Sequence, residues 1–119
     1  MWKMPIVTVI LALLSASVTA GEVKIVKVQA MKRASGWHFN VTLKHDDEGW
    51  NHYADAWRIV TADGKELGTR TLYHPHVDEQ PFTRGLPEVI IPSGMKSVFV
   101  EAHDKVHGWA KQRYEVRLK

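Results

Sequence analysis

The 119-residue sequence contains no cysteine. Disulfide bonds, thiolate metal ligands, a cysteine nucleophile and a lipid-bearing cysteine are therefore excluded within it. Stability has to come from packing, and a chain of this length is expected to build one core.

A large excess of one charge is also missing. The sequence has 16 Lys and Arg residues against 13 Asp and Glu residues, a net charge of +3. Loss of Lys3 with the leader described below leaves 15 basic residues and a net charge of +2. Because nucleic-acid binding depends on neutralising many phosphates, this small excess argues against a nucleic-acid partner.

The N-terminus has the three parts of a secretory signal peptide. A short basic start at residues 1–3 precedes an apolar run at residues 6–14, and Val18-Thr19-Ala20 fits the small-residue pattern that signal peptidase cuts. The apolar run is shorter than the roughly 20 residues of a membrane span, which disfavours the alternative of an uncleaved anchor. We expect a signal peptide at 1–20 and an exported domain at 21–119, periplasmic or secreted, with no membrane span.

Alternation of apolar and polar residues dominates the remainder and predicts half-buried strands, as in Trp37, Phe39, Val41 and Leu43. A slip in the alternation after Ile25 predicts a bulge. No helical stripe is evident. Seven short strands separated by turns predict an all-β, antiparallel sandwich of immunoglobulin or fibronectin-III type. The expected strands cover Val23–Ala30, Trp37–Leu43, Tyr53–Thr61, Leu67–Tyr73, Phe82–Ile91, Ser97–His103 and Gln112–Leu118.

Six of the seven histidines should gather at one end of this sandwich. Consecutive antiparallel strands reverse direction, so the connections after the second, fourth and sixth strands meet at the same end, away from His38. These histidines are His45, His52, His74, His76, His103 and His107.

A histidine cluster of this kind predicts a site for zinc, copper or nickel. His74 and His76 flank a proline that keeps the chain extended, so both rings can face one side. We expect His74, His76 and His107 to bind the metal, assisted by His52, His103 or Glu79. The alternative is that these histidines are solvated loop residues.

Four further residues are expected to support this end. Asp55 is in phase with buried neighbours and should point inward, paired with Arg84 or with Arg70. Trp50 and Trp109 should form a binding surface, or else cap the core. The acidic residues 46–48 are expected to form a solvated turn, because they lack the spacing of a calcium loop.

Catalysis is not expected. Beyond residue 20 the only serines are Ser35, Ser93 and Ser97, which fall toward the end opposite the histidines, so a Ser-His-Asp arrangement is disfavoured. No glycine-rich phosphate loop, zinc-protease helix or dinucleotide fingerprint occurs. Metal-assisted hydrolysis stays open as a further alternative.

Two strings in the sequence resemble those of small exported bacterial proteins, which carry HYADxW and HPHxxEQPFTR. Here they read His52-Tyr53-Ala54-Asp55-Ala56-Trp57 and residues 74–84, and a third shared piece covers Ala102–Trp109. The resemblance implies an exported sandwich and marks these residues, but it implies no reaction.

The sequence therefore predicts an exported binding protein that holds a divalent transition metal at a histidine-rich end. The alternative is a metal-free module that binds a protein of the cell envelope.

Overall fold

The computed structural model describes residues 21–119; the predicted signal peptide at 1–20 lies outside the described residues. Within residues 21–119 the chain forms eight β-strands and no helix. The part of the chain described here contains no helix long and apolar enough to cross a membrane. The strands are β1 (Lys24–Arg33), β2 (Gly36–Lys44), β3 (Ala54–Val60), β4 (Glu66–Thr71), β5 (Phe82–Val89), β6 (Ser97–Asp104), β7 (Gly108–Trp109) and β8 (Tyr114–Arg117).

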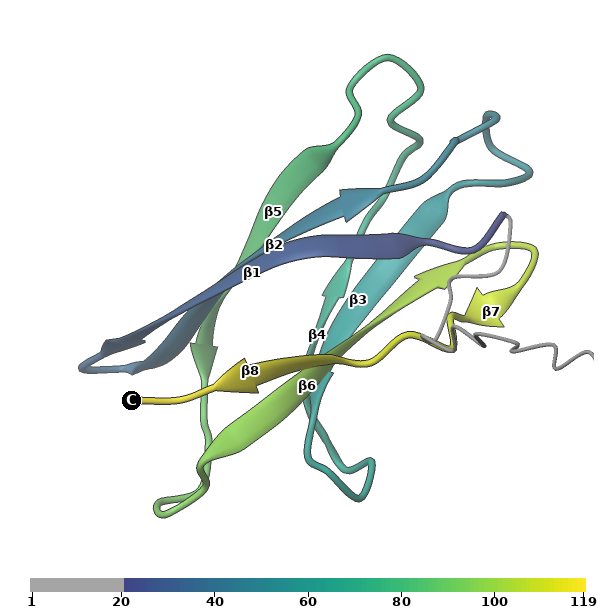
Figure 1. Ribbon diagram of the computed structural model, residues 1–119. Helices are drawn as coiled ribbons and strands as arrows, with labels where there is room; N and C mark the ends of the chain where they lie inside the picture. Colours follow the sequence, from purple (N-terminus) through teal and green to yellow (C-terminus); the bar gives the residue numbers. More distant parts are fainter. Residues whose placement is uncertain (1–20) are drawn as a thin grey trace, which may run out of the picture.

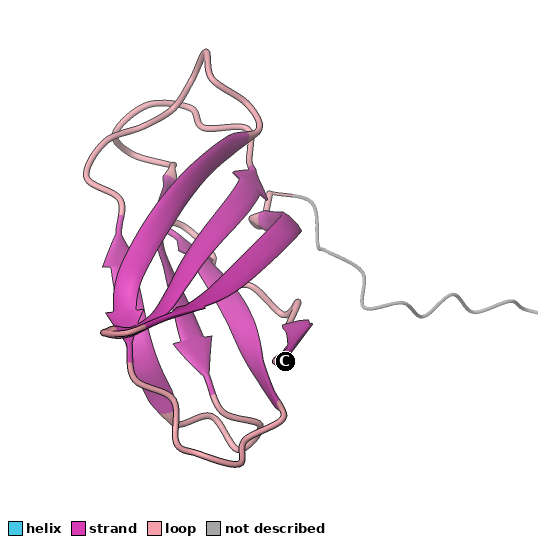
Figure 2. Cartoon of the chain, turned by 90° about the vertical axis from the view of Figure 1, so that its left-hand side faces the viewer, coloured by secondary structure: helices cyan, strands magenta, loops and turns pink. Residues whose placement is uncertain are grey.

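The strands form two antiparallel sheets that face each other, as Figure 2 shows. One sheet has the order β1-β2-β5, and the other has the order β4-β3-β6-β7, with β8 also paired to β6. One more strand is present among these residues than the seven expected, because the two-residue β7 precedes β8 along the same edge of β6. The predicted bulge in β1 is confirmed by a register shift between Ile25 and Lys27.

The core fills the space between the sheets, and strict alternation places it there. In β6, for example, Val98, Val100 and Ala102 are buried whereas their neighbours in sequence are not. Trp57 on β3 is fully buried at the centre. Burial of these apolar side chains supplies the main stabilisation of a chain without disulfides.

The connections after β2, β4 and β6 lie toward the same end of the molecule (Figure 1). Hydrogen bonds join them: the His76 N–H donates to Asp47, and the Lys105 N–H donates to the Tyr53 carbonyl. The expected gathering of these three connections is therefore present. We call this the histidine end.

Candidate functional site

Three side chains at the histidine end bring potential metal ligands together. One ligand atom from each of His45, His52 and Asp104 lies within 4.8 Å of the other two. His52 Nε2 is 3.2 Å from Asp104 Oδ1, and His45 Nε2 is 4.0 Å from Asp104 Oδ2. Two imidazoles and one carboxylate are a donor set that zinc and other divalent transition metals accept.

The core alternation continues into this group. His45 and Asp47 follow the buried series Phe39, Val41 and Leu43, and both are buried. Asp104 likewise follows Ala102 on β6 and is fully buried. The strand ends therefore place these polar groups at the rim of the core.

Asp47 fixes the orientation of His45. Its Oδ1 accepts a hydrogen bond from His45 Nδ1 at 2.6 Å and from the Ala54 N–H at 3.0 Å, and its Oδ2 accepts from the His76 N–H at 2.7 Å. A carboxylate on one ring nitrogen is the usual support of a metal-bound histidine. The other nitrogen of His45, Nε2, donates a hydrogen bond to the Gly21 carbonyl at 2.9 Å and would have to exchange this bond for a metal. The expectation of a solvated turn at 46–48 is wrong for Asp47, although Asp46 and Glu48 are exposed.

Asp104 is held by backbone donors. Its Oδ1 accepts hydrogen bonds from the N–H groups of Val106 at 2.9 Å and His107 at 2.7 Å. Burial acts to raise the pKa of Asp104, but these N–H groups and the His107 side chain together lower it. The carboxylate is therefore kept ionised and able to face a cation.

The ring of His52 has one side satisfied and one side without a partner. Nδ1 lies 2.8 Å from Glu48 Oε1, whereas Nε2 is buried and makes no hydrogen bond. Burial acts to lower the pKa of His52, but the Glu48 hydrogen bond and the charges of Asp104 and Glu48 raise it. A buried nitrogen that makes no hydrogen bond but lies 3.2 Å from the Asp104 carboxylate fits a position where a cation would bind between the two groups.

The residues predicted to bind the metal lie at three separate positions in the structure. Of the six, His52 is in the group described above, and His107 lies beside it, with its ring centroid 5.1 Å from that of His52. The rings of His74 and His76 are 4.7 Å apart, but His76 stacks on Phe82. His103 lies on the outer face of β6, its ring 4.9 Å from Trp109.

Arg84 lies next to the predicted pair rather than next to Asp55. Its Nη2 is 3.0 Å from His76 Nε2 and donates to Glu79 Oε1 at 3.1 Å. Burial, followed by the charge of Arg84 and then that of His74, lowers the pKa of His76. A guanidinium in this position opposes the approach of a metal cation to Nε2.

The inward orientation predicted for Asp55 is wrong. Its Oδ1 is 2.5 Å from His103 Nδ1, and its Oδ2 is 3.9 Å from Lys105 Nζ. The register of β3 against β6 shifts between Ala54 and Ala56, and this irregularity turns Asp55 to the outer face beside His103. Arg70, the other expected partner, donates to backbone carbonyls instead.

The two tryptophans differ in exposure. Trp50 is 66% exposed, and Trp109 is 36% exposed under the guanidinium of Arg58, 3.6 Å above the ring. Tyr73, Val77 and Val106 are also exposed on the connections at the histidine end. These connections therefore present apolar side chains to solvent.

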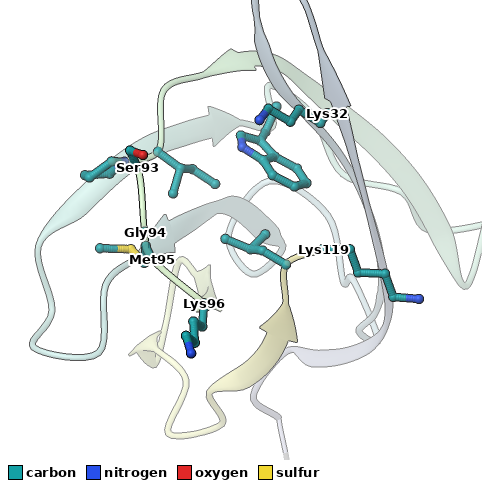
Figure 3. A pocket seen from close by; sticks show the side chains of 10 residues that line it. Lys32, Ser93, Gly94, Met95, Lys96 and Lys119 are labelled. Atoms are coloured by element: carbon teal, nitrogen blue, oxygen red, sulfur yellow. The ribbon is translucent and has the colours of Figure 1, made fainter.

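An open hollow lies at the end of the sandwich opposite the histidine end. It has a volume of about 430 Å³, and Lys32, Lys96 and Lys119 surround it together with Trp37. Figure 3 shows the three lysines at this hollow. Its lining has neither histidine nor carboxylate side chains, so it does not fit a metal ion.

Sequence reasoning missed three residues of the site: His45 as a ligand, Asp47 and Asp104. The sequence does mark them, because each continues the alternating series of buried residues along β2 or β6. A polar residue at a core position needs a partner, so it marks a site more strongly than a histidine in a loop does.

Comparison with known proteins finds one relative of interest. Over 74 residues the chain is 45% identical to a protein of Halomicrobium mukohataei described as "Putative lipoprotein". The match covers 62% of this chain and 36% of that protein, so the chain spans about a third of the relative's length. No family model and no solved structure matches the chain.

Proposed function

We propose that this protein is an exported domain of the cell envelope that binds a divalent transition metal at its histidine end. The signal-peptide pattern at 1–20 supports export, and the description of the relative as a lipoprotein supports an envelope location. The division of the strands, β1-β2-β5 against β4-β3-β6-β8, supports an immunoglobulin-like sandwich of the fibronectin-III type.

The observation that carries the proposal is the approach of His45, His52 and Asp104, with ligand atoms within 4.8 Å of one another. Small movements of these side chains bring all three to about 2.0–2.2 Å from one ion. Asp47 supplies the supporting carboxylate. Zinc, copper and nickel all accept this donor set.

His74, His76 and Glu79 form the alternative donor group at the same end. We assign the ion to the His45 group because the positive charge of Arg84 lies beside His76, 3.0 Å from its Nε2, whereas the carboxylate of Asp104 faces His52. His107 is the nearest additional ligand, since it contacts both His52 and Asp104. His103 takes part instead in the pair with Asp55 on the outer face.

We infer binding of the ion rather than turnover. A hollow of about 190 Å³, lined by Gly21, Glu22, Lys24, Lys44, His45 and Asp46, adjoins the site. A hollow of this size has little room for an organic substrate.

A metal-free interaction module is the second candidate. The exposed apolar residues Trp50, Tyr73, Val77 and Val106 favour it, because aromatic and aliphatic side chains on one surface are typical of protein interfaces. Their partner would be a protein of the envelope.

Calorimetric titration with zinc(II) and copper(II) separates the two candidates. We expect one ion per chain, and we expect His52→Ala to weaken binding at least about a hundredfold because it removes a ligand. The control His38→Ala changes a histidine that bonds to Asn40 outside the site and should bind as the parent does. The double variant His74→Ala/His76→Ala tests the alternative donor group.

Loss of binding in the double variant with retention in His52→Ala would transfer the site to His74 and His76. Absence of binding by the parent would favour the interaction module.

A further inference from the structure

Gly21 lies within the group of histidines. Its carbonyl oxygen is 2.9 Å from His45 Nε2. A Cβ atom added to Gly21 would lie 2.7 Å from Cε1 and 3.1 Å from Nε2 of His107. Any larger residue at this position would therefore have to displace the His107 ring.

The same residue is the first one after the predicted signal-peptide cut. We propose that the mature N-terminus is itself a metal ligand, with the free α-amino group of Gly21 binding the ion together with His45, His52 and Asp104. This inference rests on the proposed metal site and on cleavage before Gly21.

The contacts of Gly21 with His45 and His107 place this residue beside the proposed ligands. Two ligands at about 2.0–2.1 Å from one ion lie roughly 2.9–3.4 Å apart for angles of 90–109°. In the structure, the Gly21 carbonyl accepts a hydrogen bond from His45 Nε2 at 2.9 Å, and His52 Nε2 pairs with Asp104 Oδ1 at 3.2 Å. An ion would replace the protons in these two contacts, and it would also have to draw His45 Nε2 and Asp104 Oδ2 together from 4.0 Å. The α-nitrogen of Gly21 is separated from its carbonyl oxygen by two carbon atoms, so the two atoms can close a five-membered ring with an ion.

The donor chemistry favours copper(II). An amine, two imidazoles and carboxylate or carbonyl oxygens form a nitrogen-rich set, and tetragonal nitrogen and oxygen sites are characteristic of copper(II). The bound ion displaces the proton of the amine, as metals do at protonated ligands.

An uncut chain cannot offer this ligand, because the Gly21 nitrogen is then part of a peptide bond and its lone pair is delocalised. Removal of the leader would therefore complete the site. The exported, processed protein would then bind copper(II) more tightly than the uncut chain.

The test compares two forms of the full chain, each expressed with its leader and recovered after export. One has the natural sequence, and the other has two serines inserted between Ala20 and Gly21, which keeps Gly21 and all other ligands but moves the free amine away. Mass spectrometry establishes where each chain begins. Copper(II) affinity is measured by competition with a chelator, and electron paramagnetic resonance is recorded with natural and with [15N]glycine-labelled protein.

We expect the insertion to weaken copper(II) binding at least about tenfold, equivalent to loss of about 1.4 kcal/mol. We also expect the glycine label to change the nitrogen hyperfine splitting of the processed natural chain and to leave that of the insertion form unchanged. The insertion form is thus the matched control for the isotope experiment.

Equal affinities with no isotope effect would overturn the inference and leave the His45, His52 and Asp104 site in place. A natural chain that begins elsewhere than Gly21 would overturn it as well. Failure of both forms to bind copper(II), zinc(II) or nickel(II) would instead reject the proposed function, and this inference with it.

Discussion

Two buried carboxylates, those of Asp47 and Asp104, hold the segments of the histidine end in place through hydrogen bonds. Asp47 bonds to His45 and to the backbone N–H groups of Ala54, at the start of β3, and of His76, in the connection after β4. Asp104 holds the turn that carries His107. Asp47 thus satisfies buried donors that would otherwise have no partner, and Asp104 satisfies two partly buried N–H groups of the turn. The positions of the imidazoles follow from these bonds.

His76 makes the stability of the protein depend on pH. Burial, and after it the charges of Arg84 and His74, lower its pKa, against opposing effects of Glu79 and Asp47. Because the unfolded chain binds this proton more readily than the folded one, the free energy of unfolding falls as pH drops through the unfolded value of about 6.5, until the folded His76 also titrates. Above that window the contribution is fully present.

Replacing His76 by Gln should therefore flatten the dependence of the unfolding free energy on pH as the pH falls below about 6.5. Urea denaturation of the parent and of His76→Gln, both with chelator present, measures the two slopes in one buffer series. Parallel slopes would contradict the assignment of this proton to His76.

At the residue scale the sequence predicted where the histidines gather but not which of them share a site. Strand reversal alone places the six side chains at one end. The choice of His45 over His74 depends on Asp47 and Arg84. Asp47 contacts His76, a residue about thirty positions away, and the contact of Arg84 with His76 depends on the orientation of the Arg84 side chain. Such contacts leave no local pattern in the sequence.

Alternation predicted the strands well because each one has a buried face and a solvated face. The boundaries differ by a few residues: β1 extends to Arg33, whereas β5 ends at Val89. The two-residue β7 was missed, since a bridge of this length carries no periodicity. The orientation of Asp55 was also missed, because one irregularity between β3 and β6 reverses the face that a residue occupies.

The side chain of Gln112 acts as a strand neighbour at the bulge in β1. Its Oε1 accepts from the Ile25 N–H at 2.8 Å, and its Nε2 donates to the Ile25 carbonyl at 3.1 Å. This amide joins β1 of one sheet to the segment between β7 and β8 of the other.

Gln112→Ala should lower the free energy of unfolding by about 1–3 kcal/mol, because it removes the partners of two backbone groups of Ile25. The matched control is Gln29→Ala on the same strand, where the side chain is exposed. The midpoints of urea denaturation measure both changes. Equal effects of the two substitutions would show that the bridge contributes nothing of its own.

At the scale of the whole molecule, the two ends of the sandwich differ in chemistry. One end carries imidazoles and buried carboxylates, and the other carries Lys32, Lys96 and Lys119 around an open hollow. The proposed ion would join the connection after β2 to the end of β6, and these strands belong to different sheets. Metal binding should therefore oppose separation of the sheets.

We expect zinc(II) at a hundred times its dissociation constant to raise the free energy of unfolding by about 2.7 kcal/mol. Chelator should reverse the increase, and His52→Ala should abolish it. Denaturation curves with and without zinc(II) measure the difference. An equal increase in His52→Ala would contradict binding at this site.

Asp104 accepts hydrogen bonds from backbone N–H groups, so the turn after β6 depends little on which side chains it carries. A carboxylate that bonds to main-chain atoms of the following turn tolerates exchange of the exposed residues there, such as Val106, since those side chains do not hold the turn in place. Replacement of Val106 by another exposed residue should therefore leave the geometry of this turn unchanged.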